Sequence, residues 1–187
     1  CIRDRFTYDR VDWHRIQLTR MREAGIDVAA MIMQPGRSGR LAVTALAAAM
    51  EALDSVGADL PMACLWLDAS GLAQPGDAAD ALVDRVYQSV REFHLCLPAR
   101  YAATIPLNAD NGGGVAVPVV IALPPDPEVQ GDGGMRNELR RRFRREFGRD
   151  LIVLGTRPGS WDGIVADAFA EGYAGVKDHA VRIASIY

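Results

Sequence analysis

The chain has 187 residues, of which 49% are hydrophobic and 24% are charged, and its formal net charge is −3 at pH 7. This composition excludes intrinsic disorder, and the length accommodates one sizeable core. The acidic balance provides no general attraction to nucleic acid or anionic lipid, and no apolar run approaches the roughly 20 residues of a membrane span. We therefore expect neither nucleic acid nor a membrane as a partner.

Apolar segments along the chain alternate between helix-like and strand-like patterns. Apolar stripes at helical spacing predict helices over about 9–23, 41–56, 77–95, 135–147 and 163–171. Short apolar runs predict strands over 26–33, 61–67, 117–123, 151–155 and 181–187. The stretch 96–114 ends in Asn111-Gly112-Gly113-Gly114, so we expect an irregular connection there.

Regular alternation of strand and helix predicts parallel strands with right-handed crossovers. A doubly wound sheet and a (β/α)-barrel both satisfy this pattern, but no glycine fingerprint follows the first strand, which disfavours the doubly wound sheet. A helix opens the chain and a strand closes it, which suits an excised part of a barrel. We therefore expect an α/β fold, namely an incomplete (β/α)8 TIM-type barrel of about five parallel strands with outer helices. We expect it to form a single partial domain over 1–187, with both ends cut from a longer chain.

Polar and aromatic residues follow several of the predicted strands. Because the carboxyl ends of parallel strands meet at one edge, we expect these residues to form one rim. Aromatic rings stack on pyranose rings and carboxylates supply acid, base or nucleophile, so the set is typical of a sugar site. The candidate substrate-binding residues are Gln34, Trp66, Asp126, Arg157 and Trp161, and the candidate catalytic residue is Asp68. For Asp68, stabilisation of the following loop is the structural alternative.

Other chemistry-bearing features favour structural roles. The loop 35–40 is rich in glycine and arginine, but its spacing matches no phosphate-binding motif, so an ordinary turn is favoured over a phosphate cradle. The arginine-rich helix 135–147 favours a solvated outer face over a nucleic-acid contact. His14 lies on an apolar stripe and is expected to be a hydrogen-bonded packing residue. Three distant histidines and three scattered cysteines predict no metal site and no disulfide framework.

Several stretches share a pattern of aromatic, charged and turn residues that is spread over most of the chain. They are Phe6-Thr7-Tyr8-Asp9, Trp13-His14-Arg15-Ile16-Gln17-Leu18, Met21-Arg22-Glu23-Ala24-Gly25-Ile26-Asp27-Val28, Trp66-Leu67-Asp68, Val90-Arg91-Glu92-Phe93, Phe143-Arg144-Arg145-Glu146-Phe147-Gly148, Ser160-Trp161 and Gly172-Tyr173-Ala174-Gly175. Together they resemble the barrels of glycoside hydrolase families 71 and 99, in which a helix ending in AGID precedes the second barrel strand.

This resemblance implies an endo-acting, α-glycanase-like barrel acting on bacterial or fungal polysaccharide, with a retaining or an inverting outcome. Family-99 relatives carry their acting carboxylates in a motif resembling NEWxEG late in the barrel, and this sequence contains no such motif. The resemblance therefore implies catalytic carboxylates beyond Tyr187, in a parent protein whose localisation is left open, secretion included. The alternative is a non-catalytic carbohydrate-binding barrel, and a sugar-phosphate enzyme using the loop 35–40 ranks below both. Carbohydrate is the expected partner, and no cofactor is expected.

Overall fold

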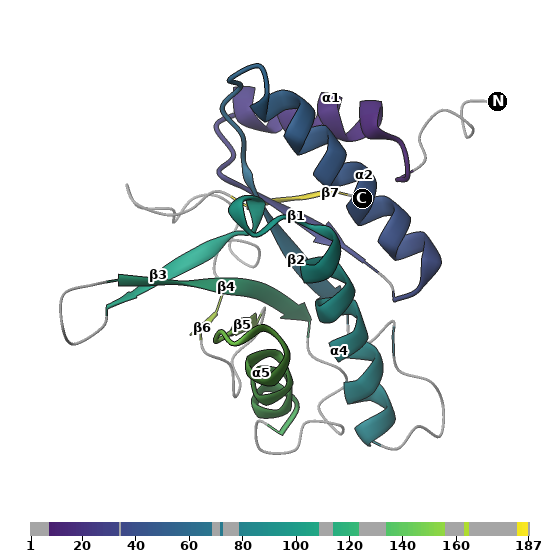
Figure 1. Ribbon diagram of the computed structural model, residues 1–187, viewed down its shortest axis with the longest axis vertical. Coiled ribbons are helices and arrows are strands. Elements are labelled where there is room, and N and C mark those ends of the chain that lie inside the picture. The colour runs from purple at the N-terminus through teal and green to yellow at the C-terminus, as the bar shows by residue number, and fades with distance from the viewer. Residues whose placement is uncertain are drawn as a thin grey trace.

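The computed structural model describes residues 8–33, 35–68, 72, 79–108, 114–123, 134–155, 163–164 and 183–186. From Val11 to Gly155 the helices alternate with parallel strands, as the sequence predicts, and one additional antiparallel strand lies within this order (Figure 1). The elements are α1 (Val11–Glu23), β1 (Val28–Ile32), α2 (Arg37–Asp54), β2 (Met62–Asp68), α4 (Ala79–Cys96), the 3-10 helix η2 (Ala99–Tyr101), β3 (Thr104–Asn108), β4 (Gly114–Leu123), α5 (Gly134–Phe147), β5 (Ile152–Gly155), β6 (Gly163–Ile164) and β7 (Ile183–Ile186). No helix in these ranges combines the length and the hydropathy that crossing a membrane requires.

A sheet of parallel strands forms the centre of the molecule. Its order is β6-β5-β4-β2-β1-β7, and each neighbouring pair along this path is parallel. All five predicted strands are present, as β1, β2, β4, β5 and β7. The prediction of an α/β fold with parallel strands and flanking helices is thereby confirmed. Because β6 and β7 lie at opposite ends of the path, the described sheet is open, and its strands do not close into a ring.

The two faces of the sheet contribute to two different apolar clusters. Successive strand residues point to opposite faces, so Met31 of β1 and Leu65 of β2 pack with the helices, whereas Cys64 and Trp66 belong to the second cluster. Each of the four long helices supplies fully or almost fully buried side chains to the first cluster: Leu18, Leu46, Phe93 and Phe143. The described helices therefore cover one face of the sheet, unlike the helices of a doubly wound fold, which cover both.

Glycines with positive φ follow the ends of three helices, at Gly25, Gly57 and Gly148. At the end of α1, Gly25 has a φ of 72°, and the amide of Ile26 donates a hydrogen bond of 2.8 Å to the carbonyl of Met21. This is the Schellman arrangement, which needs a left-handed residue and therefore favours glycine. Gly57 repeats it after α2 with a φ of 73°. These turns return the chain directly to β1 and β2.

The prediction of an irregular connection over 96–114 is wrong. Within it, β3 pairs antiparallel with the first half of β4, from Thr104 opposite Pro118 to Asn108 opposite Gly114. The apolar positions 105, 107, 115 and 117 share one face of this hairpin, so cross-strand pairing compensates for the nearby glycines. The glycines at 112–114 follow β3, so their effect on the backbone does not extend to residues 104–108.

Two predicted helices also need correction. The second helix begins at Arg37 rather than at 41, with Gly36 at its N-cap, so most of the predicted loop 35–40 is helical. The helix predicted over 163–171 begins instead as β6, which pairs with β5, and residues 165–171 lie outside the described residues. Gly163 and Ile164 are not strong helix formers, so their pairing with β5 decides their structure.

The side chain of Phe143 tests the helix-covered core. It is fully buried at 0% exposure, so Phe143→Ala should lower the free energy of unfolding by about 4 kcal/mol. Val56→Ala, at a residue that is 76% exposed, should change it by less than about 0.5 kcal/mol. Urea denaturation measures both, and similar values for the two variants would contradict the described packing.

Candidate functional site

The carboxyl ends of the parallel strands meet at one edge of the sheet. The strand registers place Ile32 opposite Trp66, and Asp68 opposite Leu123. Gly155 closes β5 beside the same end of β4. The structure therefore brings together the strand ends from which the predicted rim extends.

Most of the predicted rim lies outside the described residues: Gln34, Asp126, Arg157 and Trp161. The backbone of Asp68 is described as the last residue of β2, but its side chain is not. The grouping of these side chains into a sugar site therefore stays a prediction.

Trp66 is the rim candidate whose side chain the structure describes. It is 6% exposed and belongs to the second apolar cluster, with Ala30, Cys64 and Ile121. We call the face of the sheet that carries this cluster, and that the described helices leave uncovered, the helix-free face. Burial raises the pKa of the Cys64 thiol to about 12, so this cysteine is a protonated packing residue. Trp66 thus forms an apolar base beneath the carboxyl edge, and only a small part of its surface is open to a ligand.

A buried carboxylate that the sequence analysis did not select holds the turn between β1 and α2. Glu92 of α4 is 3% exposed, and its Oε2 accepts a hydrogen bond of 2.9 Å from the amide of Gly36. Its Oε1 accepts a bond of 3.1 Å from the Gln88 side chain and lies 3.4 Å from a guanidinium nitrogen of Arg40. The carboxylate is therefore placed at the N-terminus of α2, where the helix dipole favours negative charge.

This contact bears on the phosphate-cradle interpretation of the loop 35–40. An anion bound at the start of α2 would need free amide groups and a free arginine there. The Glu92 carboxylate already accepts a hydrogen bond from the amide of Gly36 and forms an ion pair with Arg40. It therefore occupies the position that a bound anion would need. The contact favours the ordinary turn over the sugar-phosphate site. In the sequence, the one sign of this buried carboxylate is that Glu92 lies next to the apolar stripe of the helix predicted over 77–95.

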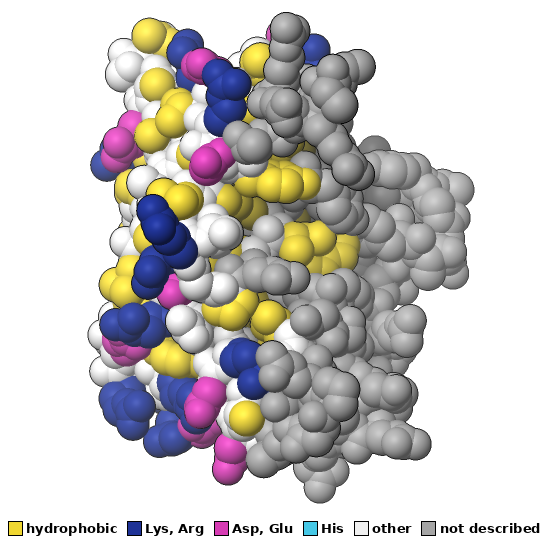
Figure 2. All heavy atoms as spheres, turned by 90° about the vertical axis from the view of Figure 1, so that its right-hand side faces the viewer, with side chains coloured by type: hydrophobic (Ala, Val, Ile, Leu, Met, Phe, Trp, Pro, Cys, Tyr) yellow, Lys and Arg dark blue, Asp and Glu magenta, His cyan; other side chains and the backbone are white. Residues whose placement is uncertain are grey.

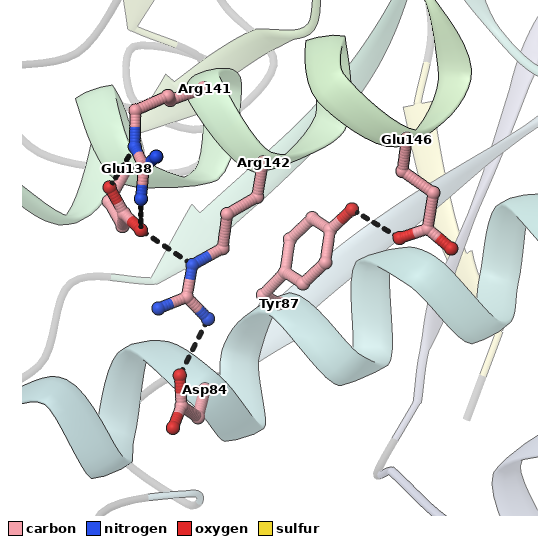
Figure 3. Close-up of polar contacts among 6 residues, drawn as sticks. All are labelled: Asp84, Tyr87, Glu138, Arg141, Arg142 and Glu146. Carbon is pink, nitrogen blue, oxygen red and sulfur yellow. Dashed lines mark hydrogen bonds and ion pairs between the residues drawn. The ribbon is translucent and has the colours of Figure 1, made fainter.

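Polar contacts also connect α4 with α5 (Figure 3). The Tyr87 hydroxyl donates a hydrogen bond of 2.7 Å to Glu146, and Arg142 lies 2.6 Å from Asp84. Arg142 also binds Glu138, and hydrogen bonds from Arg141 and Arg142 lower the pKa of Glu138 to about 2. Burial, followed by the bond to Glu146, raises the pKa of Tyr87. This network fastens the two helices to each other.

Two histidines are packing residues in the structure. His14 is 0% exposed, and its Nε2 lies 2.7 Å from the carbonyl oxygen of Tyr8, which confirms its predicted role. His94 packs edge-on against Phe93 and Phe143, and its Nε2 has no hydrogen-bond partner among the described residues. Burial, with a smaller effect of nearby Arg149, lowers the pKa of His94 to about 4.

A hollow of about 450 Å³ lies at the opposite, amino edge of the sheet. Its lining includes Arg22, Asp27 and Asp59, and the Arg22 guanidinium pairs with both carboxylates. Glu23 is the third carboxylate of the lining, and we assign this hollow no function.

The described part of the chain contains no group of three or more His, Cys, Asp or Glu residues that could hold a metal ion. Comparisons with models of protein families, with curated protein sequences and with solved structures found no match.

The buried Glu92 carboxylate should stabilise the fold. Glu92→Leu leaves the Gly36 amide without its acceptor and should lower the free energy of unfolding by about 3 kcal/mol, whereas Glu92→Gln retains an acceptor and should cost about 1 kcal/mol. Glu51→Gln, at a carboxylate whose side chain is 53% exposed, should cost less than about 0.5 kcal/mol. Chemical denaturation separates these values, and an unchanged stability of Glu92→Leu would show that the clamp is unimportant.

His94 should make stability dependent on pH. Its pKa is about 4 in the folded state against an ordinary 6.5, so the folded state favours the neutral ring. This contribution is complete above pH 6.5 and is lost as the pH falls toward 4, by up to about 3 kcal/mol in total. His94→Phe should retain the aromatic packing and show a flatter stability profile between these pH values. If the stability of the wild type and of His94→Phe changes equally with pH, the lowered pKa of His94 is refuted.

Proposed function

We propose that this protein is a glycoside hydrolase-like (β/α)-barrel protein that acts on a polysaccharide at the carboxyl edge of its parallel strands. The strand order supports this proposal, because β1, β2, β4, β5 and β6 follow one another across the sheet in chain order. Their helices lie on one face, as the helices of successive barrel strands do. In that arrangement the helix-free face is the barrel interior. One departure is β7, which occupies the free edge of β1.

The observation that carries the proposal is the end of β2. Positions 64, 66 and 68 share one face, because a strand has a period of two residues. Cys64 and Trp66 belong to the apolar cluster on this face, and the strand then ends at Asp68 at the carboxyl edge. An apolar interior that becomes polar at this edge is where barrel enzymes bind substrate.

Within the proposal, Asp68 is a catalytic carboxylate and Trp66 supports the base of the site. Gln34 and Arg157 would bind sugar hydroxyl or carboxylate groups, and Trp161 would stack on a sugar ring. Hydrolysis requires two carboxyl groups about 5 to 9.5 Å apart across the scissile bond. The partner of Asp68 would be Asp126 or a carboxylate of a longer parent chain.

A non-catalytic carbohydrate-binding barrel is the second candidate. Among the described residues that close the parallel strands, Asp68 alone carries a carboxylate: the others are Ile32, Leu123, Gly155, Ile164 and Ile186. One carboxylate can bind a sugar hydroxyl but cannot serve as both acid and nucleophile. This observation favours binding without turnover.

Asp68→Asn tests the proposed site, with Asp59→Asn as the matched control in the segment before the amino end of the same strand. We expect the wild-type chain to bind a neutral α-glucan or α-mannan in titration calorimetry. Asp68→Asn should weaken this binding about tenfold or more, because a charged hydrogen bond contributes about 1.5 to 3 kcal/mol, and Asp59→Asn should leave it unchanged.

Release of new reducing ends distinguishes the two candidates. Product formation that Asp68→Asn abolishes supports the hydrolase, and binding without product supports the carbohydrate-binding barrel. Absence of binding to every neutral glycan, or equal effects of the Asp68 and Asp59 variants, would refute a sugar site at this edge.

A further inference from the structure

Four arginines and an asparagine line one surface hollow on the outer side of α5. We call this the arginine surface; its residues are Asn137, Arg140, Arg141, Arg144 and Arg145, and the hollow measures about 440 Å³. These positions are three or four residues apart, so they share one side of the helix. Leu139 and Phe143, both 0% exposed, hold the opposite side against the core. The arginines are therefore directed away from the sheet.

The nearby carboxylates leave an excess of positive charge. Residues 134–150 contain seven arginines and three carboxylates, a formal charge of +4 in a chain whose total is −3. Glu138 binds both Arg141 and Arg142, and Asp150 binds Arg144. Lysine and arginine side chains gather at the lower left of Figure 2, at the height where α4 and α5 lie in Figure 1, with acidic side chains among them.

The arginines that take part in ion pairs remain open to a ligand. The side chains of Arg141 and Arg144 are 62% and 64% exposed. Exposed ion pairs contribute little free energy, so an incoming anion can replace or share them at low cost. Guanidinium groups bind carboxylate, sulfate or phosphate oxygens in a bidentate manner. The arginine surface thus has the chemistry of a site for a ligand with several anionic groups.

We propose that the arginine surface binds an anionic polysaccharide, a glycan chain that carries carboxylate or sulfate groups. The choice of a glycan rests on the proposed function, and the anionic class rests on the arginines. Duplex DNA carries about one negative charge per 1.7 Å of its length. The remainder of this acidic chain would repel that charge density more strongly than the sparser charges of a glycan. The described surface also lacks an aromatic lining residue on which a base could stack.

The test compares two double variants that remove equal charge. Arg140→Gln with Arg145→Gln changes the arginine surface, and Arg15→Gln with Arg20→Gln changes a second hollow on the exposed side of α1. Probes are labelled polygalacturonate, which is carboxylated, heparin, which is sulfated, neutral dextran and a short DNA duplex. Circular dichroism and thermal midpoints check that each variant is folded.

We expect the wild-type chain to bind at least one acidic glycan more tightly than DNA, with affinity that falls as salt is added. The α5 double variant should lose about fivefold per arginine, equal to about 1 kcal/mol each, and the α1 control should stay within about twofold of the wild type. Equal losses in both variants, no binding of either acidic glycan, or tighter binding of DNA would overturn the proposal.

The outcome is separable from that of the proposed function. Asp68→Asn should leave acidic-glycan binding at α5 intact while it weakens neutral-glycan binding at the carboxyl edge. If no neutral glycan binds, but acidic glycans still bind and the α5 double variant weakens that binding, only the carboxyl-edge site is refuted. If neutral glycans bind, but the α5 double variant does not change the binding of acidic glycans, only the arginine surface is refuted.

Discussion

The parallel pairing of β1 with β2 is the constraint on which the other described elements depend. The two strands pair from Val28 opposite Met62 to Ile32 opposite Trp66. Because they run in the same direction, the chain must return outside the sheet, and α2 makes that return. The helix buries its apolar stripe on one face and leaves the other face to the cluster that contains Trp66. The same register therefore decides both the position of the core and the position of the candidate edge.

Polar contacts between the helices favour one alignment of the helices over others. Apolar burial is non-directional and does not select one alignment of neighbouring helices. Glu92 connects α4 to the start of α2, and Tyr87 and Asp84 connect α4 to α5 through Glu146 and Arg142. A buried carboxylate such as Glu92 is costly if its partners are removed, so these contacts penalise other alignments. The turn that follows β1 is consequently held by a helix 56 residues further along the chain.

Much of the fold could be predicted from the sequence because its patterns are local. The apolar runs at 26–33 and 117–123 correspond to β1 and β4, and the stripes over 9–23 and 77–95 correspond to α1 and α4. The strand β3 was missed because its stability depends on cross-strand pairs with β4, which a linear pattern does not contain. β6 was missed for a similar reason, since two residues gain strand structure only beside β5.

The candidate site could be predicted less completely. The sequence located strand ends that the parallel registers bring to one edge, but it could not predict that Trp66 is almost fully buried there. The role of Glu92 depends on the distant Gly36 amide, and the lowered pKa of His94 depends on burial beside α5. Each of these properties arises from contacts between segments far apart in the chain, and none has a local sequence pattern.

The positions of the two proposed sites constrain the size of a shared ligand. α5 follows the carboxyl end of β4 and ends shortly before the amino end of β5, so it runs away from the carboxyl edge. With a rise of about 1.5 Å per residue, Arg140 and Arg145 lie about 9 and 16 Å along the helix from Gly134. They also lie on the outer side of the helix layer, whereas Trp66 belongs to the helix-free face of the sheet. A single sugar cannot contact both sites, so a ligand that joins them must be a polymer that passes over the edge of the sheet.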